Sequence, residues 1–505
     1  MIMPNSDSRY FIAKYDSAGE IKKLVPTNVF INKMAIDRSG NMLIAGNSSD
    51  PLSSYVFGKD TVRKTGGNFF SYIAKYDSSF QAIWGQAISS TYQTGITSSA
   101  IDKNGFIYVA VSFHDTLFSG NDTIVSGWGD FGSDLLLIKY NSLGQSVWFR
   151  HIHGIANLLS WVTAPAITIG ENDNLYITGF FVTSVIFDKD TLICSDETDI
   201  FVAKYDSSGN LLWDKRAGGG LRSGIIPFKL GDAGQAIGTD IYGNVYVAGT
   251  FYGNARFDSI SIRTIFGNDS NDIFLAKYSP QGMIKWVKAA GSPLDQDYVQ
   301  GVTINSNGRV YITGTFYDTM IFDSDTLGSH GLADIYIAEY DSNGTVHATV
   351  GGGGDSLCYA NGIIGFKNGG IGILGSFYGT GYFGTKSIIS NGMTDIFVIK
   401  YMNLDESIVE DLPTSAISKN AGILEAYPNP FNPMVQIRFN VSSNDQVRLS
   451  MHNVSGQLIK TLFVGSDEIG PHRLNFNAHE LNSGIYLIEF KQAQMIHYMK
   501  IILTK

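Results

Sequence analysis

The sequence predicts an all-β protein. We expect a β-propeller of six to seven blades, each a four-stranded antiparallel sheet, followed by a small immunoglobulin-like β-sandwich. Three observations support this. A phrase of the kind DIFVAKYDSSGNLLW recurs along most of the chain. Glycine is abundant, with 56 residues, whereas charged residues make up only 16%. The last 80 or so residues lack the repeat but contain several short strand-like runs.

Length and composition fit many short strands joined by turns. At 505 residues the chain is too long for one ordinary hydrophobic core, so it holds several domains or a repetitive architecture. Its 44% hydrophobic and 12% aromatic residues exclude disorder. Many glycines with few charged residues are typical of tight turns between strands.

The repeat is marked by one position in seven copies of the recurring phrase. Successive copies lie 61 to 73 residues apart, a spacing that indicates a repeat architecture. The marker residues are Lys14, Lys75, Lys139, Lys204, Lys277, Glu339 and Lys400. A second phrase, of the kind AIDRSGNMLIAG, alternates with the first and occurs six times.

Each repeat contains four strand-like runs, as residues 236–290 illustrate. AIGTD, VYVAGTF, DIFLAKY and MIKWVKA are expected as strands, with turns at IYGN and SPQG and an inserted hairpin before the third strand. Four antiparallel strands in each repeat make a propeller blade. The third strand is apolar on both faces, so neighbouring sheets must cover it on both sides.

The composition of the first and last repeats indicates whether the repeats form a closed ring or an open stack. A linear solenoid needs polar terminal repeats, yet the last copy, DIFVIKY, is as apolar as the others, which favours a ring. Seven third strands stand against six first and second strands. Either the first half-blade completes the last blade, or the start of the natural chain is missing.

These motifs resemble the bacterial SBBP β-propeller repeat family. The resemblance covers about residues 9–405 and rests on GN-x-YV-x-G followed by D-[IA]-F-[VL]-AKYD-x-x-G-x-x-x-W. It weakens at the last fourth strand, where ESIVED lacks the tryptophan. The family implies a propeller fold and brings no common activity.

Several residues that could carry chemistry have a simpler structural interpretation. The recurring lysine is expected to pack its stem and pair with a nearby carboxylate. The D-x-x-G turns, such as Asp206 to Gly209, are interpreted as capped turns and not as calcium loops. His151 and His153 would share a strand face, but no third ligand stands at a telling spacing. The runs AGGG and GGGG are expected as turns between blades. No catalytic residue, metal or cofactor is therefore expected.

The two cysteines do not form a disulfide framework. Cys194 and Cys358 lie in different repeats, so free buried thiols are expected.

A ligand, if the propeller binds one, is expected on the face carrying the loops that lead into the first strand and out of the second. This expectation rests on analogy with other propellers. The residues of these loops suit glycan or protein contacts, although a merely solvated loop has the same composition. They are Asp232, Asp295, Asp297, Tyr298, Asp355 and Tyr359.

Net charge and hydropathy exclude other partners. Before residue 426 there are 29 Lys and Arg against 41 Asp and Glu, and after it 7 against 5. An acidic body without a basic run argues against nucleic acid and against an anionic membrane surface. No apolar run approaches the roughly 18 residues of a membrane-spanning helix.

The chain divides into three regions. Residues 1–402 form the propeller with an incomplete first blade, residues 403–425 are a polar linker, and residues 426–505 form the sandwich. In the last region a stiff segment, AYPNPFNP, precedes an alternating strand, and VRLSMHNVSGQLIKTL is expected as a hairpin.

Residues 426–505 resemble the type A sorting domain of the type IX secretion system. The matching positions are Pro428, Asn429, Pro430, Gly456, Gly470, Ser483, Gly484, Tyr486, Lys500 and Lys505. His452-Asn453 and Phe476-Asn477 depart from the family's usual Tyr-Asp and Trp-Asp. The resemblance implies that the type IX translocon and its sorting machinery handle this domain at the outer membrane.

Export of such cargo normally begins with a signal peptide. The N-terminus, MIMPNSDSRYF, has neither a basic nor an apolar region of that kind, so we expect the natural start to be truncated or misassigned. The sequence thus predicts a secreted or surface-attached propeller, non-enzymatic, binding an extracellular protein or glycan. The alternative is a propeller hydrolase or lyase acting on extracellular polysaccharide.

Overall fold

The computed structural model describes residues 10–504 with several gaps. These are 17–18, 28, 49–53, 65, 121, 127–131, 155–160, 196, 220–230, 268–270, 294–296, 324, 385, 391–392, 403–423, 428, 430, 442–444, 454–456, 466–469 and 493–494. The chain forms two compact units, Met1–Leu412 and Pro413–Lys505. The division falls inside the segment that the sequence predicts as a linker. The elements that the structure describes are all β-strands.

The N-terminal unit repeats one sheet of four strands. The first strands are β3 (Lys33–Ile36), β9 (Thr94–Ile101), β15 (Val162–Ile169), β21 (Ala233–Thr239), β27 (Tyr298–Ile304) and β33 (Cys358–Gly365). The second strands are β4 (Met42–Asn47), β10 (Ile107–Phe113), β16 (Leu175–Phe181), β22 (Val245–Tyr252), β28 (Val310–Phe316) and β34 (Ile371–Phe377).

The recurring phrase forms the third strand and the run after its turn forms the fourth. The third strands are β1 (Tyr10–Tyr15), β7 (Phe69–Tyr76), β13 (Asp134–Tyr140), β19 (Asp199–Tyr205), β25 (Asn271–Tyr278), β31 (Asp334–Tyr340) and β37 (Asp395–Tyr401). The fourth strands are β2 (Ile21–Thr27), β8 (Ala82–Ser90), β14 (Ser146–Ile152), β20 (Leu211–Gly218), β26 (Ile284–Gly291) and β32 (Val346–Gly354). Neighbouring strands within these sheets pair antiparallel, as β10 does with β13 and β22 with β25.

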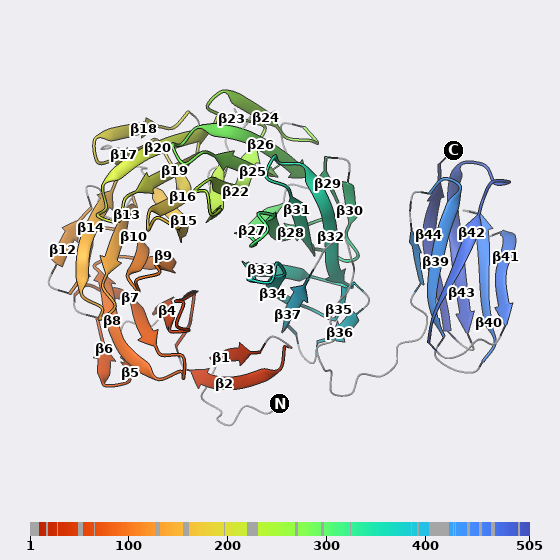
Figure 1. Ribbon diagram of the computed structural model, residues 1–505, viewed down its shortest axis with the longest axis horizontal. Helices are drawn as coiled ribbons and strands as arrows, with labels where there is room; N and C mark the ends of the chain where they lie inside the picture. Colours follow the sequence, from red (N-terminus) through yellow and green to blue (C-terminus); the bar gives the residue numbers. More distant parts are fainter. Residues whose placement is uncertain are drawn as a thin grey trace. The chain divides into compact units, whose positions relative to one another are not determined.

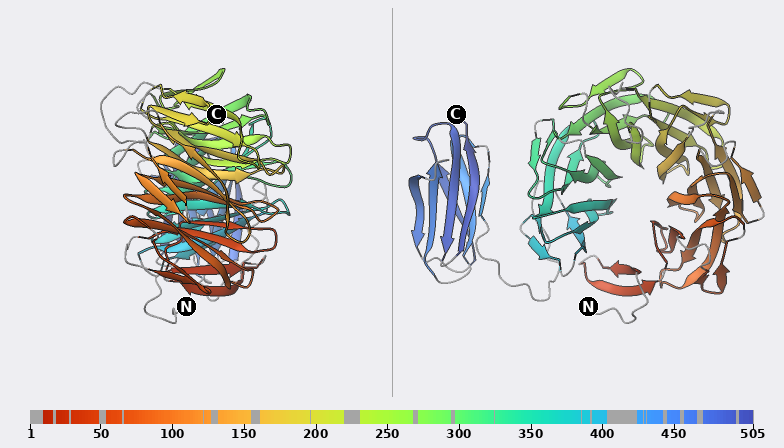
Figure 2. Two further views of the ribbon diagram at one scale, coloured as in Figure 1. Left: turned by 90° about the vertical axis from the view of Figure 1, so that its left-hand side faces the viewer. Right: turned by 180° about the vertical axis from the view of Figure 1, so that it is seen from behind.

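The sheets follow one another around a central axis with their first strands innermost (Figures 1 and 2). We number them first to sixth, from the sheet of β3 to the sheet of β33. Buried apolar clusters lie between successive sheets, for example Phe201 and Ala203 of the third sheet against Leu135 and Leu137 of the second. The expected covering of both sheet faces is therefore confirmed, and the unit is a β-propeller.

A short hairpin lies between the second and third strands of each sheet, and four of the six hairpins pair with the fourth strand of the sheet before. The hairpins are β5 (Tyr55–Phe57) with β6 (Asp60–Val62), β11 (Thr116–Ser119) with β12 (Asp122–Val125), β17 (Ser184–Phe187) with β18 (Asp190–Ile193), β23 (Asn254–Phe257) with β24 (Ile260–Arg263), β29 (Thr319–Phe322) with β30 (Asp325–Gly328), and β35 (Thr380–Phe383) with β36 (Lys386–Ile389). β11 pairs with β8, β23 with β20, β29 with β26 and β35 with β32. This pairing extends the outer edge of the preceding sheet and covers an otherwise exposed strand edge.

The two ends of the repeat region do not share a sheet. β1 and β2 form a two-stranded sheet, and β33, β34 and β37 form a three-stranded one. Among the strands that the structure describes, the first half-blade therefore does not complete the last blade.

The glycine run GGGG lies in a strand and not in a turn, which corrects the expectation from sequence. Gly351 to Gly354 end β32, and Gly353 passes so close to Asp334 that a Cβ there would lie 1.7 Å from the Asp334 Oδ1 atom. Gly353 is glycine because the backbone there packs directly on a buried carboxylate.

The C-terminal unit is a two-sheet sandwich. One sheet has the order β38 (Leu424–Tyr427), β39 (Met434–Val441), β42 (Gly470–Asn477), and the other β41 (Leu458–Gly465), β40 (Val447–Asn453), β43 (Gly484–Gln492), β44 (Met495–Leu503). Its core includes Phe439, Leu449 and Phe490. Phe476, at a position where the sorting family usually has tryptophan, also packs in this core and is 8% exposed.

Candidate ligand-binding sites

The recurring lysines join neighbouring sheets and do not form a functional ring. Lys204 Nζ donates to the carbonyl oxygen of Pro280 at 2.9 Å, and Lys277 Nζ donates to that of Ser342 at 2.8 Å. Lys139 does the same to Ser207 at 2.7 Å. The acceptor is thus a carbonyl oxygen in the D-x-x-G-type turn of the next repeat. The carboxylate partner expected from sequence is wrong for these three lysines.

The D-x-x-G turns are capped as the sequence predicts. Asp206 Oδ1 accepts the backbone N–H groups of Ser208 and Asn210, at 2.9 and 2.8 Å. Gly209 takes a φ of +82°, a conformation that favours glycine. The carboxylate is therefore used inside the turn.

Two aspartates of the predicted ligand face are buried. Asp232 is 2% exposed and accepts the N–H groups of Gly219 and Tyr252 at 2.9 and 2.8 Å. Asp297 is fully buried, and its carboxylate accepts the backbone N–H and the hydroxyl of Ser292 at 2.6 and 2.8 Å. Burial raises the pKa of Asp297 to about 7. The exposure assumed from sequence is wrong for both, because each carboxylate is buried against donors of the protein itself.

Three tyrosines remain together on the same face. Tyr298, the first residue of β27, is 41% exposed, and Tyr359 of β33 is half-buried. Tyr317 follows β28, and burial together with a hydrogen bond to Tyr359 raises its pKa to about 12, with Tyr298 also close enough to contribute. Asp355 is exposed on the segment leading into β33. Asp295 lies outside the described residues.

Sequence reasoning missed Tyr317. A signal was present, because the second strand ends in Phe-Tyr three times, at Tyr252, Tyr317 and Tyr378. Tyr252 is 8% exposed, whereas Tyr317 is half-buried. The repeated Phe-Tyr pair therefore predicts a tyrosine where each of these three second strands ends. It does not predict which of the tyrosines reaches solvent.

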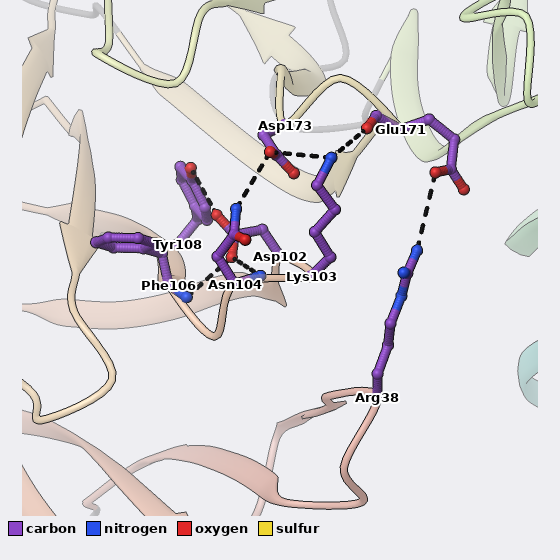
Figure 3. Close-up of polar contacts among 8 residues, drawn as sticks. All are labelled: Arg38, Asp102, Lys103, Asn104, Phe106, Tyr108, Glu171 and Asp173. Atoms are coloured by element: carbon purple, nitrogen blue, oxygen red, sulfur yellow. Dashed lines mark hydrogen bonds and ion pairs between the residues drawn. The ribbon is translucent and has the colours of Figure 1, made fainter.

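The turns between the first and second strands form a small polar hollow of about 140 Å³. Figure 3 shows its contacts: Asp102 accepts the N–H groups of Asn104 and Phe106, both at 2.9 Å, and the hydroxyl of Tyr108 at 3.3 Å. Burial and Asp102 raise the pKa of Tyr108 above its ordinary value. Asp102 thus shapes its own turn.

Ion pairs cross this hollow between three successive repeats (Figure 3). Lys103 Nζ lies 3.2 Å from Asp173 Oδ2 and donates to the Glu171 carbonyl oxygen at 2.9 Å. Arg38 reaches the Glu171 carboxylate at 3.8 Å. These two ion pairs use both cations of the hollow, whereas its lining also includes Asp37 and Asp102, so the hollow keeps an excess of negative charge.

The histidine pair and the two cysteines are the residues that could carry metal or thiol chemistry. His151 and His153 share a strand face, with ring centroids 5.1 Å apart, and His151 Nε2 lies 2.8 Å from Asp134 Oδ2. No group of three His, Cys, Asp or Glu among the described residues is arranged to hold a metal ion. Cys194 and Cys358 form no disulfide, and Cys358 is buried as expected whereas Cys194 is only partly buried. Burial raises the pKa of Cys358 to about 12, which leaves its thiol protonated.

One carboxyl on the outer part of the propeller has a perturbed pKa. Burial, with a contribution from Asp190, raises the pKa of Asp214 to about 6. Asp214 lines a hollow of about 360 Å³ together with Arg216, Arg256 and Asp258. A carboxyl whose pKa lies within about a unit of neutral pH is a candidate general acid.

Described positions of the predicted sorting motif lie in or next to the strands β42, β43 and β44. Asn429 Oδ1 accepts the N–H of Ile502 in β44 at 2.8 Å, and Tyr486 donates its hydroxyl to the Asn482 carbonyl oxygen at 2.8 Å. Gly470 begins β42, Gly484 begins β43 directly after Ser483, and Lys500 lies in β44. Pro428, Pro430, Gly456 and Lys505 lie outside the described residues.

Fold and sequence together define an exported β-propeller with a sorting tail. Residues 425–504 match the family described as a secretion system C-terminal sorting domain. Residues 285–315 match the family described as a beta-propeller repeat, SBBP. The tail is the type IX sorting domain and implies export to the cell surface or the extracellular space. No helix long and apolar enough to cross a membrane occurs in the described part of the chain.

More distant similarities are weak. The chain is 28% identical to the uncharacterized WD repeat-containing protein L264 of Acanthamoeba polyphaga mimivirus, over 36% of this chain and 15% of that protein. The matched region thus spans about 15% of that relative's length.

Two solved structures are also similar. PorZ, a surface component of the type IX secretion system of Porphyromonas gingivalis, is 11% identical, with 99% of this chain and 73% of that chain covered and a TM-score of 0.26. A member of the DUF4221 family from Bacteroides vulgatus is 10% identical, with 71% and 94% covered and a TM-score of 0.27. At these TM-scores neither similarity supports an argument about fold or function.

Proposed function

We propose that this protein is a non-enzymatic β-propeller that the type IX secretion machinery exports and that binds glycans outside the cell. The observation that carries the proposal is the group of Tyr298, Tyr317 and Tyr359. The exposed Asp355 lies on the segment that leads into β33, the strand of Tyr359. The group lies on the face where loops enter the first strands and leave the second.

The chemistry of these side chains suits a sugar ring. A tyrosine offers an apolar face with a polar hydroxyl at its edge, and a pyranose offers an apolar C–H face with hydroxyls at its rim. Asp355 supplies acceptors for sugar hydroxyls. With its pKa raised to about 12, Tyr317 keeps its proton and remains a hydrogen-bond donor at physiological pH.

A glycan array probed with the full-length chain tests the ligand. We expect retention of at least one glycan class and a loss of affinity of about tenfold or more in Tyr298→Ala, because stacking surface is removed. Tyr242→Ala is the matched control, since Tyr242 is 77% exposed on the turn between β21 and β22. Absence of any retained glycan, or equal losses in both variants, would refute glycan binding at this face.

Export is tested separately in the native host. Deletion of residues 425–505 removes the matched sorting domain. We expect the truncated chain to be retained within the cell and not to cross the outer membrane. An antibody against residues 10–402 detects it. Unchanged appearance of the truncated chain outside the cell would refute the sorting role without bearing on glycan binding.

The alternative is a polysaccharide-active enzyme, and Asp214 is the observation that favours it. A carboxyl with a pKa of about 6 can donate a proton to a leaving oxygen. The alternative predicts release of reducing ends from an extracellular polysaccharide by the wild type and a loss of about a hundredfold or more in Asp214→Asn. Equal rates in both proteins would exclude Asp214 as the acid.

A further inference from the structure

The sixth sheet exposes an apolar face that is buried in other sheets. Ile396 and Val398 of β37 are 51% and 39% exposed. Their equivalents in β19, Ile200 and Val202, are 0% and 1% exposed because the fourth sheet packs on them. The sequence of β37 is therefore that of a covered strand.

The exposed region continues across the whole sheet. Leu374 of β34 is 46% exposed and Ile364 of β33 is 58% exposed. We call Ile364, Leu374, Ile396 and Val398 the open face. Four large apolar side chains on adjoining strands form a patch of the kind that marks an interaction surface.

The sheet of β1 and β2 is also incomplete, and its exposed side is the one that in other sheets packs against the sheet before. Phe11 and Tyr15 of β1 are 40% and 37% exposed, whereas their equivalents Phe201 and Tyr205 are fully buried. In each of the six numbered sheets the third strand pairs with a second strand, but among the described strands β1 pairs only with β2. β1 thus lacks the neighbour that its equivalents have.

We propose that the open face and the unpaired edge of β1 together bind a β-hairpin. The hairpin has the sequence pattern of the repeat's first and second strands. Such a hairpin would pair with β1 in the register of a second strand and cover the open face with its apolar side. The proposal extends an interface that the chain already builds between its successive sheets.

The geometry favours a hairpin over a second copy of the chain. A second copy has its six hairpins of this type placed in its own sheets, so it has none to offer among the described strands. Stacking of two open faces would cover apolar surface but would leave the edge of β1 unpaired. Strand addition satisfies both features at once.

The test uses a labelled synthetic peptide of residues 232–252, which contains β21 and β22, and the full-length chain. We expect saturable binding by fluorescence anisotropy and an affinity about tenfold weaker or more for Val398→Lys, because a charge is placed under the hairpin. Val147→Lys is the matched control, since Val147 of β14 is 50% exposed away from the open face. A peptide with Val245 and Val247 both changed to Lys should not bind.

Three results would overturn the proposal: no saturable binding of the peptide, equal affinity for the two chain variants, or equal affinity of the two peptides. A concentration-dependent dimer that Val398→Lys abolishes in sedimentation would also overturn it, in favour of a second copy. Urea unfolding of both variants shows whether the folded state is retained. Protection of β1 amides from hydrogen exchange on peptide binding would locate the added strand and support the proposal.

Discussion

Lys204 and Trp213 donate hydrogen bonds to the same acceptor, the carbonyl oxygen of Pro280 in the next repeat, at 2.9 and 3.1 Å. The two residues face each other across β19 and β20. The same arrangement joins Lys277 and Trp286 to Ser342. One carbonyl oxygen thus accepts hydrogen bonds from two side chains of the preceding sheet. The lysine and tryptophan that define the repeat therefore form a contact between repeats.

We predict that Trp213→Phe lowers the free energy of unfolding by about 1 kcal/mol, because the indole hydrogen bond is lost while much of the ring packing stays. Lys204 keeps the Pro280 carbonyl oxygen paired. Tryptophan fluorescence in urea suits the measurement, since all six tryptophans precede residue 412 and report only the N-terminal unit. An unchanged unfolding midpoint would show that the bond contributes nothing.

The turn that presents this carbonyl oxygen needs glycine for two reasons. Gly282 has a φ of +78°, and a Cβ there would lie 2.8 Å from the Trp213 ring. Gly308, in a turn of the same kind, has a φ of +77°, but a Cβ there would have no atom within 4 Å. Gly308→Ala therefore isolates the cost of the backbone conformation, about 1 kcal/mol.

We predict that Gly282→Ala costs about 2–3 kcal/mol, clearly more than Gly308→Ala, because the added methyl also displaces Trp213. The same fluorescence measurement compares the two variants. Equal losses would mean that the indole moves aside freely and that the close contact has no energetic weight.

Much of the fold could be predicted from sequence because the signals are local. Lys204, the D-x-x-G turns and the alternation of second and third strands recur within short windows. The acceptor of Lys204 could not be predicted, because Pro280 lies 76 residues away and is brought close only when the sheets stack.

The candidate site was less predictable for the same reason. Asp297 lies in a polar stretch of sequence of the kind that is usually exposed. In the structure it is buried, with its carboxylate accepting the backbone N–H of Ser292, a contact that no residue pattern in the sequence marks. Tyr317 is one of three similar tyrosines, and the sequence alone does not distinguish the one that lies beside Tyr359.

The fifth sheet replaces the lysine and tryptophan with a different pair of residues. Glu339 stands at the lysine position, is 3% exposed and lies 3.4 Å from Arg309, and Ala348 stands at the tryptophan position. The sequence after β37, MNLD, also lacks the glycine of the turn. In the sequence, the lysine and the tryptophan are thus missing from the sheet that precedes a segment without the turn glycine.

We predict that Glu339→Lys lowers the free energy of unfolding by about 2–3 kcal/mol, because it places a buried cation beside Arg309. The double variant Arg309→Glu, Glu339→Lys should recover part of that loss, and a double-mutant cycle measures the coupling. Strictly additive losses would contradict a direct interaction between the two side chains.

Asp297 makes the stability of the propeller depend on pH. Its pKa is about 7 in the folded protein because of burial, against an ordinary value of 3.8. Between these values the folded state holds a proton that the unfolded chain has released, so stability falls as pH rises from about 4 to about 7 and then levels off. A shift of this size corresponds to roughly 4 kcal/mol as an upper bound.

Asp297→Asn removes this titration while keeping an acceptor oxygen for Ser292. We therefore predict that the variant gains stability relative to the wild type, by up to about 3 kcal/mol, as pH is raised from about 4.5 to about 7.5. Other titrating groups are common to both proteins and cancel in the difference. Urea unfolding at three pH values, followed by tryptophan fluorescence, gives that difference directly. Parallel stability curves for the two proteins would mean that Asp297 titrates alike in the folded and unfolded chain, and the buried carboxyl would then have no part in the pH response.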